Sequence, residues 1–135
     1  MPSVVRHFWP CIETICESVN NREKITYGEL ADRLRLKLAK QEWSALLDLV
    51  AGKTKREVGD DLTWNVVYAS GPAKGLGRYF SNGDKTPGSA LLDPKNQTQV
   101  AEYEHKLQEI YECTYKLQKV EGGDRVIKVL RSKVT

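Results

Sequence analysis

Hydrophobic side chains recur every three or four residues at the start of the chain, which is the spacing of a helix with one buried face. The residues at this spacing include Val5, Phe8, Ile12, Ile15 and Val19. Pro10 is expected either to start this helix, where the first N–H groups have no partner in the helix, or to kink it. Asn20 and Asn21 are expected to end it.

Two further helices follow in the hydrophobic pattern. Thr26 stands three residues before Glu29, the spacing of a capping box, and a short helix is predicted from there to Leu36. A third helix is predicted over Ala39–Val50, with Gly52 as its stop.

The pattern changes to that of strands at Leu62. The run Leu62–Ala69 is rich in aromatic and β-branched residues, and Leu76–Phe80 is predicted to return as a second strand after a turn rich in glycine and proline. Ser81–Asn96 is predicted to be a loop with one short helical turn at Ala90–Leu92.

A long helix is predicted over Gln97–Val120, where apolar residues alternate at steps of three and four and form one stripe. Gly122 and Gly123 are expected to end it. The weak alternation over Arg125–Val134 then predicts either a strand or a basic tail across residues 122–135.

Helix, capped helix, helix and hairpin is the order of elements in a winged helix-turn-helix. A chain of 135 residues is long enough to bury its own core. We therefore predict a single α+β domain over residues 1–135, with a winged-helix-like part at 25–92, a long helix at 97–120 and a basic tail or strand at 122–135. In such folds the helix after the turn enters a DNA groove, while basic residues at helix ends and on the hairpin, or wing, hold phosphates.

Positive charge is concentrated in two segments, although the whole chain carries a net charge of only +3. Arg33–Arg56 contains seven basic residues against two acidic ones, and residues 122–135 contain four against one. A solvated helix face with a frayed tail would carry such charges too. On a winged helix, however, they would flank the third helix and extend to the wing, which favours double-stranded DNA as the partner.

Two sequence motifs occur in a fixed order within this part of the chain. Ile25–Ala31 reads ITYGELA, and Val66–Gly71 reads VVYASG, followed by Gly77-Arg78-Tyr79 and Leu91-Leu92. They resemble the TYGELA helix start and the PCHRVV-x-S-x-G … GxY … LL region of the DNA alkyltransferases that repair alkylated guanine, and of the alkyltransferase-like proteins. The resemblance covers residues 25–92 and implies a winged helix that binds DNA.

The chain departs from the family at the reactive positions. The family's nucleophilic cysteine falls on Thr63, its histidine on Trp64 and its arginine on Asn65. Alkyl transfer requires an activated thiolate, which a threonine hydroxyl does not replace, so we expect no enzyme activity. Since the alkyltransferase-like proteins also lack the cysteine, the resemblance implies a non-catalytic protein that recognises distorted or modified DNA.

The resemblance also assigns roles to individual side chains. Tyr27 corresponds to the tyrosine that helps to rotate a nucleotide out of the duplex, and Tyr79 to a tyrosine that lines the receiving pocket. Lys40 or Gln41 stands nearest to the family's arginine finger. The predicted DNA contacts are Thr26, Tyr27, Lys37, Lys40, Gln41, Lys53, Lys55, Arg56, Lys74 and Arg78. The predicted base pocket consists of Thr63, Trp64, Asn65 and Tyr79. The alternative is a packing role, which is the more common one for half-buried tyrosines such as Tyr27 and Tyr79 and for a tryptophan such as Trp64.

No metal or cofactor is expected. His7 and His105 are far apart in the sequence, and Cys11 and Cys16 lack a second pair at the spacing of a zinc site. Together with Cys113, these cysteines suit small core residues in a reducing compartment.

An alternative hypothesis is a protein-interaction module or homodimer without DNA binding, in which the stripe of Gln97–Val120 forms the interface. The two hypotheses differ in whether the basic residues gather on one face. No apolar run approaches the ~20 residues that cross a bilayer, and the first twenty residues lack the blocks of a secretory signal, so no membrane partner and a cytoplasmic location are expected.

Overall fold

The computed structural model describes residues 7–79, 91–119 and 124–130. In chain order they form helix α2 (Phe8–Asn20), strand β1 (Ile25–Thr26), helix α3 (Tyr27–Leu34), helix α4 (Lys40–Val58), the 3₁₀ helix η1 (Leu62–Asn65), strand β2 (Val66–Val67), helix α5 (Gln97–Tyr111), strand β3 (Cys113–Gln118) and strand β4 (Arg125–Leu130). Helices and small sheets contribute to one hydrophobic core, so the fold class is α+β, as predicted.

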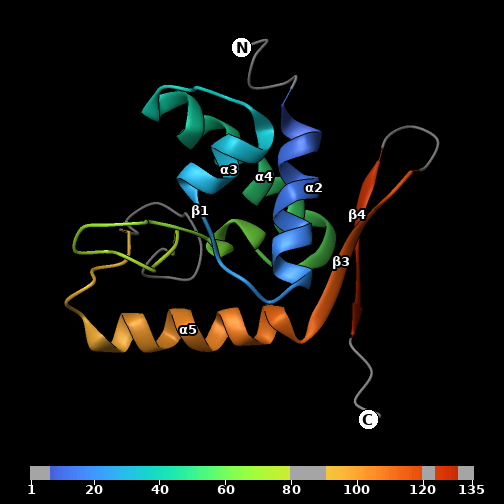
Figure 1. Cartoon of the computed structure of the whole chain (residues 1–135). Coiled ribbons are helices and arrows are strands. Elements are labelled where there is room, and N and C mark those ends of the chain that lie inside the picture. The colour runs from blue at the N-terminus through green and yellow to red at the C-terminus, as the bar shows by residue number, and fades with distance from the viewer. Residues whose placement is uncertain (1–6, 80–90, 120–123, 131–135) are drawn as a thin grey trace.

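The core surrounds helix α2, whose Ile12, Ile15 and Val19 are buried. Figure 1 shows α5 lying across one end of the molecule, with the β3–β4 ribbon beside α2. No helix in the described part of the chain is long and apolar enough to cross a membrane.

Helix α3 begins at the predicted capping box. The Glu29 N–H donates to Thr26 Oγ1 at 3.1 Å, and the Thr26 N–H donates to Glu29 Oε1 at 3.0 Å. Both N–H groups would otherwise lack a partner within the helix. The cap therefore fixes where α3 starts, and with it the position of the next residue, Tyr27.

Replacing Thr26 by alanine is expected to lower the free energy of unfolding by about 1 kcal/mol, because the Glu29 N–H loses its acceptor. Urea denaturation measures the loss. Thr98→Ala is a matched control, since Thr98 is exposed on α5 and should change stability by no more than about 0.5 kcal/mol. Equal losses in the two variants would contradict the assigned cap.

Helix α4 is longer than predicted. It continues past Gly52 to Val58 and ends at Gly59, whose φ of 80° is the left-handed conformation that glycine adopts readily. Val50 and Thr54 are buried one turn apart, so the inward-facing stripe continues beyond Val50. The predicted stop at Gly52 is wrong because packing against the core extends the helix.

The strand predicted over Leu62–Ala69 is wrong for its first four residues, which form η1. All four are buried, whereas a strand with one solvated face would expose alternate residues. Only Val66–Val67 forms a strand, and it pairs in parallel with β1. Residues 66–79, which we call the hairpin loop, turn back through isolated bridges and form no second regular strand.

Two other predictions touch residues that are only partly described. Phe80 and Ala90 lie outside the described residues. Leu91 and Leu92 do not form a helical turn, and the Leu92 N–H instead donates to the Tyr79 carbonyl at 2.7 Å.

The long helix predicted to reach Val120 ends at Tyr111. Strand β3 follows and pairs antiparallel with β4, which confirms the weakly indicated strand over Arg125–Leu130; residues 131–135 lie outside the described part. Cys113 and Tyr115 are buried while Lys116 is exposed. This alternation is that of a strand with one face buried, and β3 packs against α2.

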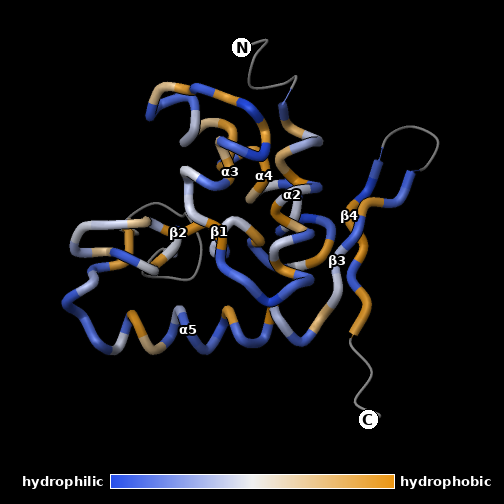
Figure 2. The backbone as a smooth tube through the Cα atoms, in the orientation of Figure 1, coloured by the Kyte–Doolittle hydropathy of each residue, from blue (hydrophilic) through white to orange (hydrophobic). Residues whose placement is uncertain are grey.

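The apolar stripe of α5 packs into the protein's own core. Tyr103, Leu107, Ile110 and Tyr111 are buried, and hydrophobic and hydrophilic positions alternate along the helix (Figure 2). The stripe that would have formed a dimer seam is thus already covered within the chain.

Candidate functional site

Three predicted DNA contacts that are distant in sequence line one pocket of about 620 Å³. Tyr27 comes from the first residue of α3, Lys40 from the first residue of α4, and Arg78 from the hairpin loop. The other lining residues are Leu38, Trp43, Ser44, Tyr68 and Leu91. We call this site the α3–α4 pocket.

Strand pairing places two tyrosines in the pocket wall. Thr26 is paired with Val67 in the β1–β2 ladder, so the residues that follow them, Tyr27 and Tyr68, lie side by side. Their ring centroids are 5.4 Å apart and their planes are inclined by 34°. Burial, together with the neighbouring Tyr68, raises the pKa of Tyr27 to about 12, so its hydroxyl keeps its proton at neutral pH.

Arg78 anchors the hairpin loop to helix α4. Its side chain is only 9% exposed, and its Nη2 pairs with Asp48 Oδ1 of α4. Its other terminal nitrogen, Nη1, is buried without a hydrogen-bond partner. Leaving a buried guanidinium donor unpaired costs free energy, which the ion pair of Nη2 with Asp48 offsets in part.

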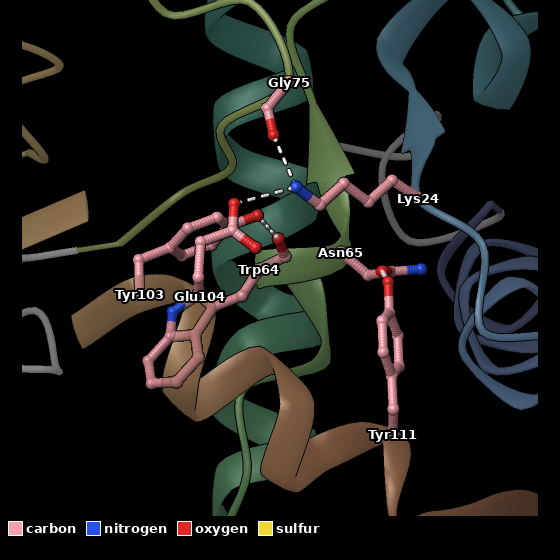
Figure 3. A network of polar contacts seen from close by, with 7 residues as sticks. All are labelled: Lys24, Trp64, Asn65, Gly75, Tyr103, Glu104 and Tyr111. Atoms are coloured by element: carbon pink, nitrogen blue, oxygen red, sulfur yellow. Dashed lines mark hydrogen bonds and ion pairs between the residues drawn. The ribbon is translucent and has the colours of Figure 1, made fainter. Parts of the chain in front are cut away.

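A polar network holds the hairpin loop against α5 from the other side (Figure 3). Lys24 Nζ donates to the Gly75 carbonyl at 2.9 Å and to Glu104 Oε1 at 3.0 Å. The Tyr103 hydroxyl donates to the Trp64 carbonyl at 2.6 Å. Lys24 thus links the hairpin loop to α5, and Tyr103 links α5 to η1.

Three of the other predicted contacts, Lys37, Gln41 and Lys74, are exposed, and Thr26 is half-buried. Lys37 lies in the segment between α3 and α4, Gln41 is the second residue of α4, and Lys74 lies near the tip of the hairpin loop, where its backbone bridges to Tyr68. Thr26 serves as the cap of α3. The structure thus places predicted contacts at the start of α3, at and before the start of α4, and on the hairpin loop.

Lys53, Lys55 and Arg56 lie at the opposite end of α4. Thirteen residues separate Lys40 from Lys53, which corresponds to roughly 20 Å along a helix. The ammonium group of Lys53 already has partners within the protein, because it pairs with Glu57 at 2.8 Å and lies 5.3 Å from the ring centre of Trp9. The predicted basic residues therefore form two separate groups, and only one lies near the pocket.

Arg56 instead lies near basic residues of the C-terminal ribbon. It lines a second pocket of about 620 Å³ together with Arg125 and Lys128 of β4. Lys128 is also paired with Asp60 at 3.1 Å. Sequence reasoning could not place these residues together, because the pairing of β4 was only weakly indicated.

The four residues predicted to form a base pocket are buried, and none of them lines the α3–α4 pocket. Thr63 and Asn65 are inaccessible, while Trp64 and Tyr79 are 4% and 1% exposed. The Thr63 hydroxyl donates to Asp61, and the rings of Trp64 and Tyr79 pack edge to face with centroids 5.1 Å apart. In this structure Trp64 and Tyr79 belong to the hydrophobic core, and Thr63 and Asn65 are buried polar residues.

The pocket lining contains no cysteine, and the chain's thiols lie elsewhere. Cys11, Cys16 and Cys113 are all buried. Burial raises the pKa of both Cys11 and Cys16 to about 12, so these thiols stay protonated at neutral pH. Among the residues that the structure describes, no three His, Cys, Asp or Glu side chains are grouped as metal ligands.

The burial of the thiols predicts slow chemical labelling. In the native protein at pH 8, reaction with an aromatic disulfide reagent should be slower than in urea by a factor on the order of a hundred or more. The released thiolate is followed by absorbance. Labelling of the native protein at the rate of the unfolded chain would contradict the burial of Cys11 and Cys16.

The site's shape and chemistry invite comparison with known proteins. No protein-family model, curated protein or solved structure matches this chain. The function must therefore be inferred from the arrangement of the chain's own side chains.

Three functional candidates were missed by the sequence reasoning. Trp43, Ser44 and Tyr68 line the pocket but are not among the DNA contacts predicted from the sequence. Trp43 and Ser44 follow Lys40 by three and four residues, which places them on the same face of α4. That spacing was the available signal; for Tyr68 the signal was the parallel pairing of two very short strands, which the sequence does not indicate.

Proposed function

We propose that the protein binds double-stranded DNA without catalysing a reaction, through the surface around the α3–α4 pocket. The observation that carries this proposal is the convergence of Tyr27, Lys40 and Arg78 from three segments on one pocket. Basic side chains beside aromatic ones suit a nucleic acid, because ammonium groups bind phosphates and rings stack on bases.

In this proposal α3, the following turn and α4 act as a winged helix-turn-helix. Helix α4 would present Lys40 and Gln41 in its first turn, at the end that enters a DNA groove. The hairpin loop would act as the wing, with Lys74 near its tip on a phosphate. The capping box of α3 supports the assignment, since it begins the motif at Thr26.

The resemblance to alkyltransferase-like proteins adds that distorted or modified DNA is the preferred target. Thr63 stands where the family's cysteine would be, and it is buried. A buried hydroxyl cannot reach an alkyl group on DNA, so the proposed role is recognition alone. Comparing duplexes with and without O6-methylguanine tests this preference.

If DNA binds at the proposed surface, removing positive charge should weaken DNA binding near the pocket but not at the far end of α4. Lys40→Ala/Lys74→Ala is expected to weaken binding to a labelled duplex and to reduce the slope of log affinity against log salt by about two, one for each lost phosphate contact. The matched control is Lys55→Ala/Arg56→Ala, which removes the same charge at the other end of α4. This control should keep the wild-type slope.

Two results would refute the proposal. One is the absence of wild-type binding at low salt. The other is a loss of slope in Lys55→Ala/Arg56→Ala but not in Lys40→Ala/Lys74→Ala, which would place DNA at the far end of α4.

A further inference from the structure

The two strands of the β3–β4 ribbon differ in how their outer edges are covered. At the outer edge of β3, the side-chain amide of Asn20 on α2 takes the place of a further strand. The Tyr115 N–H donates to Asn20 Oδ1 at 2.8 Å, and Asn20 Nδ2 donates to the Tyr115 carbonyl at 2.6 Å. Helix α2, which lies beside the ribbon in Figure 1, therefore covers this edge.

The same hydrogen bonds show which backbone groups of β4 point outward. In an antiparallel ladder, two opposite residues direct their N–H and C=O groups either towards each other or both away. Tyr115 is paired with Lys128, and its backbone groups bond to α2 on the far side, so those of Lys128 point to the outer edge of β4. Val126 shares this direction, because its N–H donates to Glu57 of α4 at 2.7 Å. By the same alternation, the backbone groups of Leu130 also point outward.

The outer edge of β4 is open at Lys128 and Leu130. Among the residues that the structure describes, neither outward N–H nor outward C=O of these two residues has a hydrogen-bond partner. Val129 and Leu130 also expose apolar side chains, which are 50% and 62% accessible. An open strand edge with exposed apolar side chains is a surface on which a further strand pairs.

Charge beside this edge indicates the chemistry of the incoming strand. Arg56 of α4 and Arg125 of β4 line the same pocket, and no hydrogen bond or ion pair engages either guanidinium group within the described part of the chain. The neighbouring carboxylates of Glu57 and Asp60 are both engaged in ion pairs within the protein. The two arginines are therefore complementary in charge to carboxylates of a partner.

We propose that the outer edge of β4 binds an extended acidic peptide segment of another protein as a third strand of the ribbon. The peptide backbone pairs with Lys128 and Leu130, and the peptide carboxylates pair with Arg56 and Arg125. A peptide suits this edge better than a nucleic acid, because a peptide backbone supplies both donors and acceptors at the spacing of a strand. A second copy of this chain is disfavoured, since its β4 would add basic residues to an edge that is already basic. The surface lies at the other end of α4 from the α3–α4 pocket, so it does not depend on DNA binding.

A labelled peptide of the sequence Val-Val-Glu-Thr-Thr-Glu tests the proposal. When it runs antiparallel to β4, its two valines lie opposite Leu130 and Val129. Its two glutamates then lie opposite Lys128 and Arg125. Fluorescence anisotropy with the full chain should give a Kd below about 1 mM.

The role of charge is tested by the variant Arg56→Gln/Arg125→Gln. It should weaken the peptide by about tenfold or more, because two charged contacts are lost. The matched control is Arg33→Gln/Lys37→Gln, which removes the same charge from exposed side chains on and after α3. This control should keep the affinity within about twofold of the wild type. Equal losses in the two variants would contradict the assigned contacts.

Pairing with the backbone of β4 is tested separately from charge. Methylation of the nitrogen of the peptide's third residue removes the donor to the Lys128 carbonyl and should weaken binding by about fivefold or more. Methylation of its fourth residue, whose N–H points away from β4, should have little effect. In the protein, amide hydrogen exchange at Lys128 and Leu130, followed by NMR, should slow when the peptide is bound.

Four results would overturn the inference. One is that no binding is detected up to about 10 mM peptide, or that a peptide with lysine in place of both glutamates binds as tightly. The second is that both methylations have the same effect, which would mean that charge alone holds the peptide. The third is slow exchange of Lys128 and Leu130 in the free protein, which would show that a second copy or the chain itself already pairs with the edge. The fourth is that a DNA duplex slows this exchange and the peptide does not.

Discussion

Gly77→Ala is expected to lower the free energy of unfolding by about 3 kcal/mol, because no space exists for the added methyl group. A Cβ atom at this position would lie 2.2 Å from the Trp64 carbonyl oxygen and 2.7 Å from the Tyr103 hydroxyl oxygen. These two groups are hydrogen-bonded to each other, so neither can move without breaking that bond. Urea denaturation measures the loss.

The matched control for this substitution is Gly28→Ala. The nearest atom to its added Cβ would be Thr26 Oγ1 at 3.9 Å, an ordinary contact, and Gly28 lies in helix α3. Alanine should therefore raise stability there by up to about 1 kcal/mol. Similar losses in both variants would contradict the close packing of Gly77. Because Arg78 follows Gly77 in the chain, Gly77→Ala should also weaken duplex binding in the proposed function.

Asn65→Ala is expected to cost about 4 kcal/mol, the largest effect of any single polar substitution proposed for this chain. Asn65 Nδ2 donates to Ser18 Oγ at 2.9 Å and to the Glu23 carbonyl at 2.8 Å, and the Tyr111 hydroxyl donates to Asn65 Oδ1. Figure 3 shows Asn65 and Tyr111 meeting in this network. Alanine removes all three bonds at once and leaves buried groups unpaired.

Asn21→Ala serves as the control for Asn65. Asn21 is exposed at the end of α2, so its replacement should change stability by no more than about 0.5 kcal/mol. Calorimetric melting of both variants measures the difference. A melting temperature of Asn65→Ala close to that of the wild type would show that the buried network contributes little.

Local signals predicted the fold where the determining contacts are close in sequence. The capping box joins Thr26 and Glu29 within one turn, and the sequence predicted it correctly. The end of α5 depends on distant contacts. Thr114 and Leu117 continue the helical spacing from Ile110, yet their pairing with Val129 and Val126 of β4 makes them part of a strand.

The site shows the same division between local and distant contacts. Charge and the TYGELA motif identified Tyr27, Lys40 and Arg78, because each stands in a recognisable local pattern. The sequence also grouped Lys53 with Lys40, since it placed both beside one short helix. In the structure α4 extends to Val58, so Lys40 and Lys53 lie far apart on one helix. The same extension brings Lys53 and Glu57 one helical turn apart, where they form an ion pair.

The three tryptophans of the chain can report directly whether DNA binds at the α3–α4 pocket. Trp43 lines the pocket, Trp64 is buried in the core, and Trp9 lies beside Lys53 at the far end of α4. Their three indole N–H signals are followed by NMR while an unlabelled duplex is added to the full chain. If DNA binds there, the Trp43 signal shifts on saturation while those of Trp9 and Trp64 stay in place. A shift of Trp9 without Trp43, or no shift of any signal, would contradict binding at this pocket.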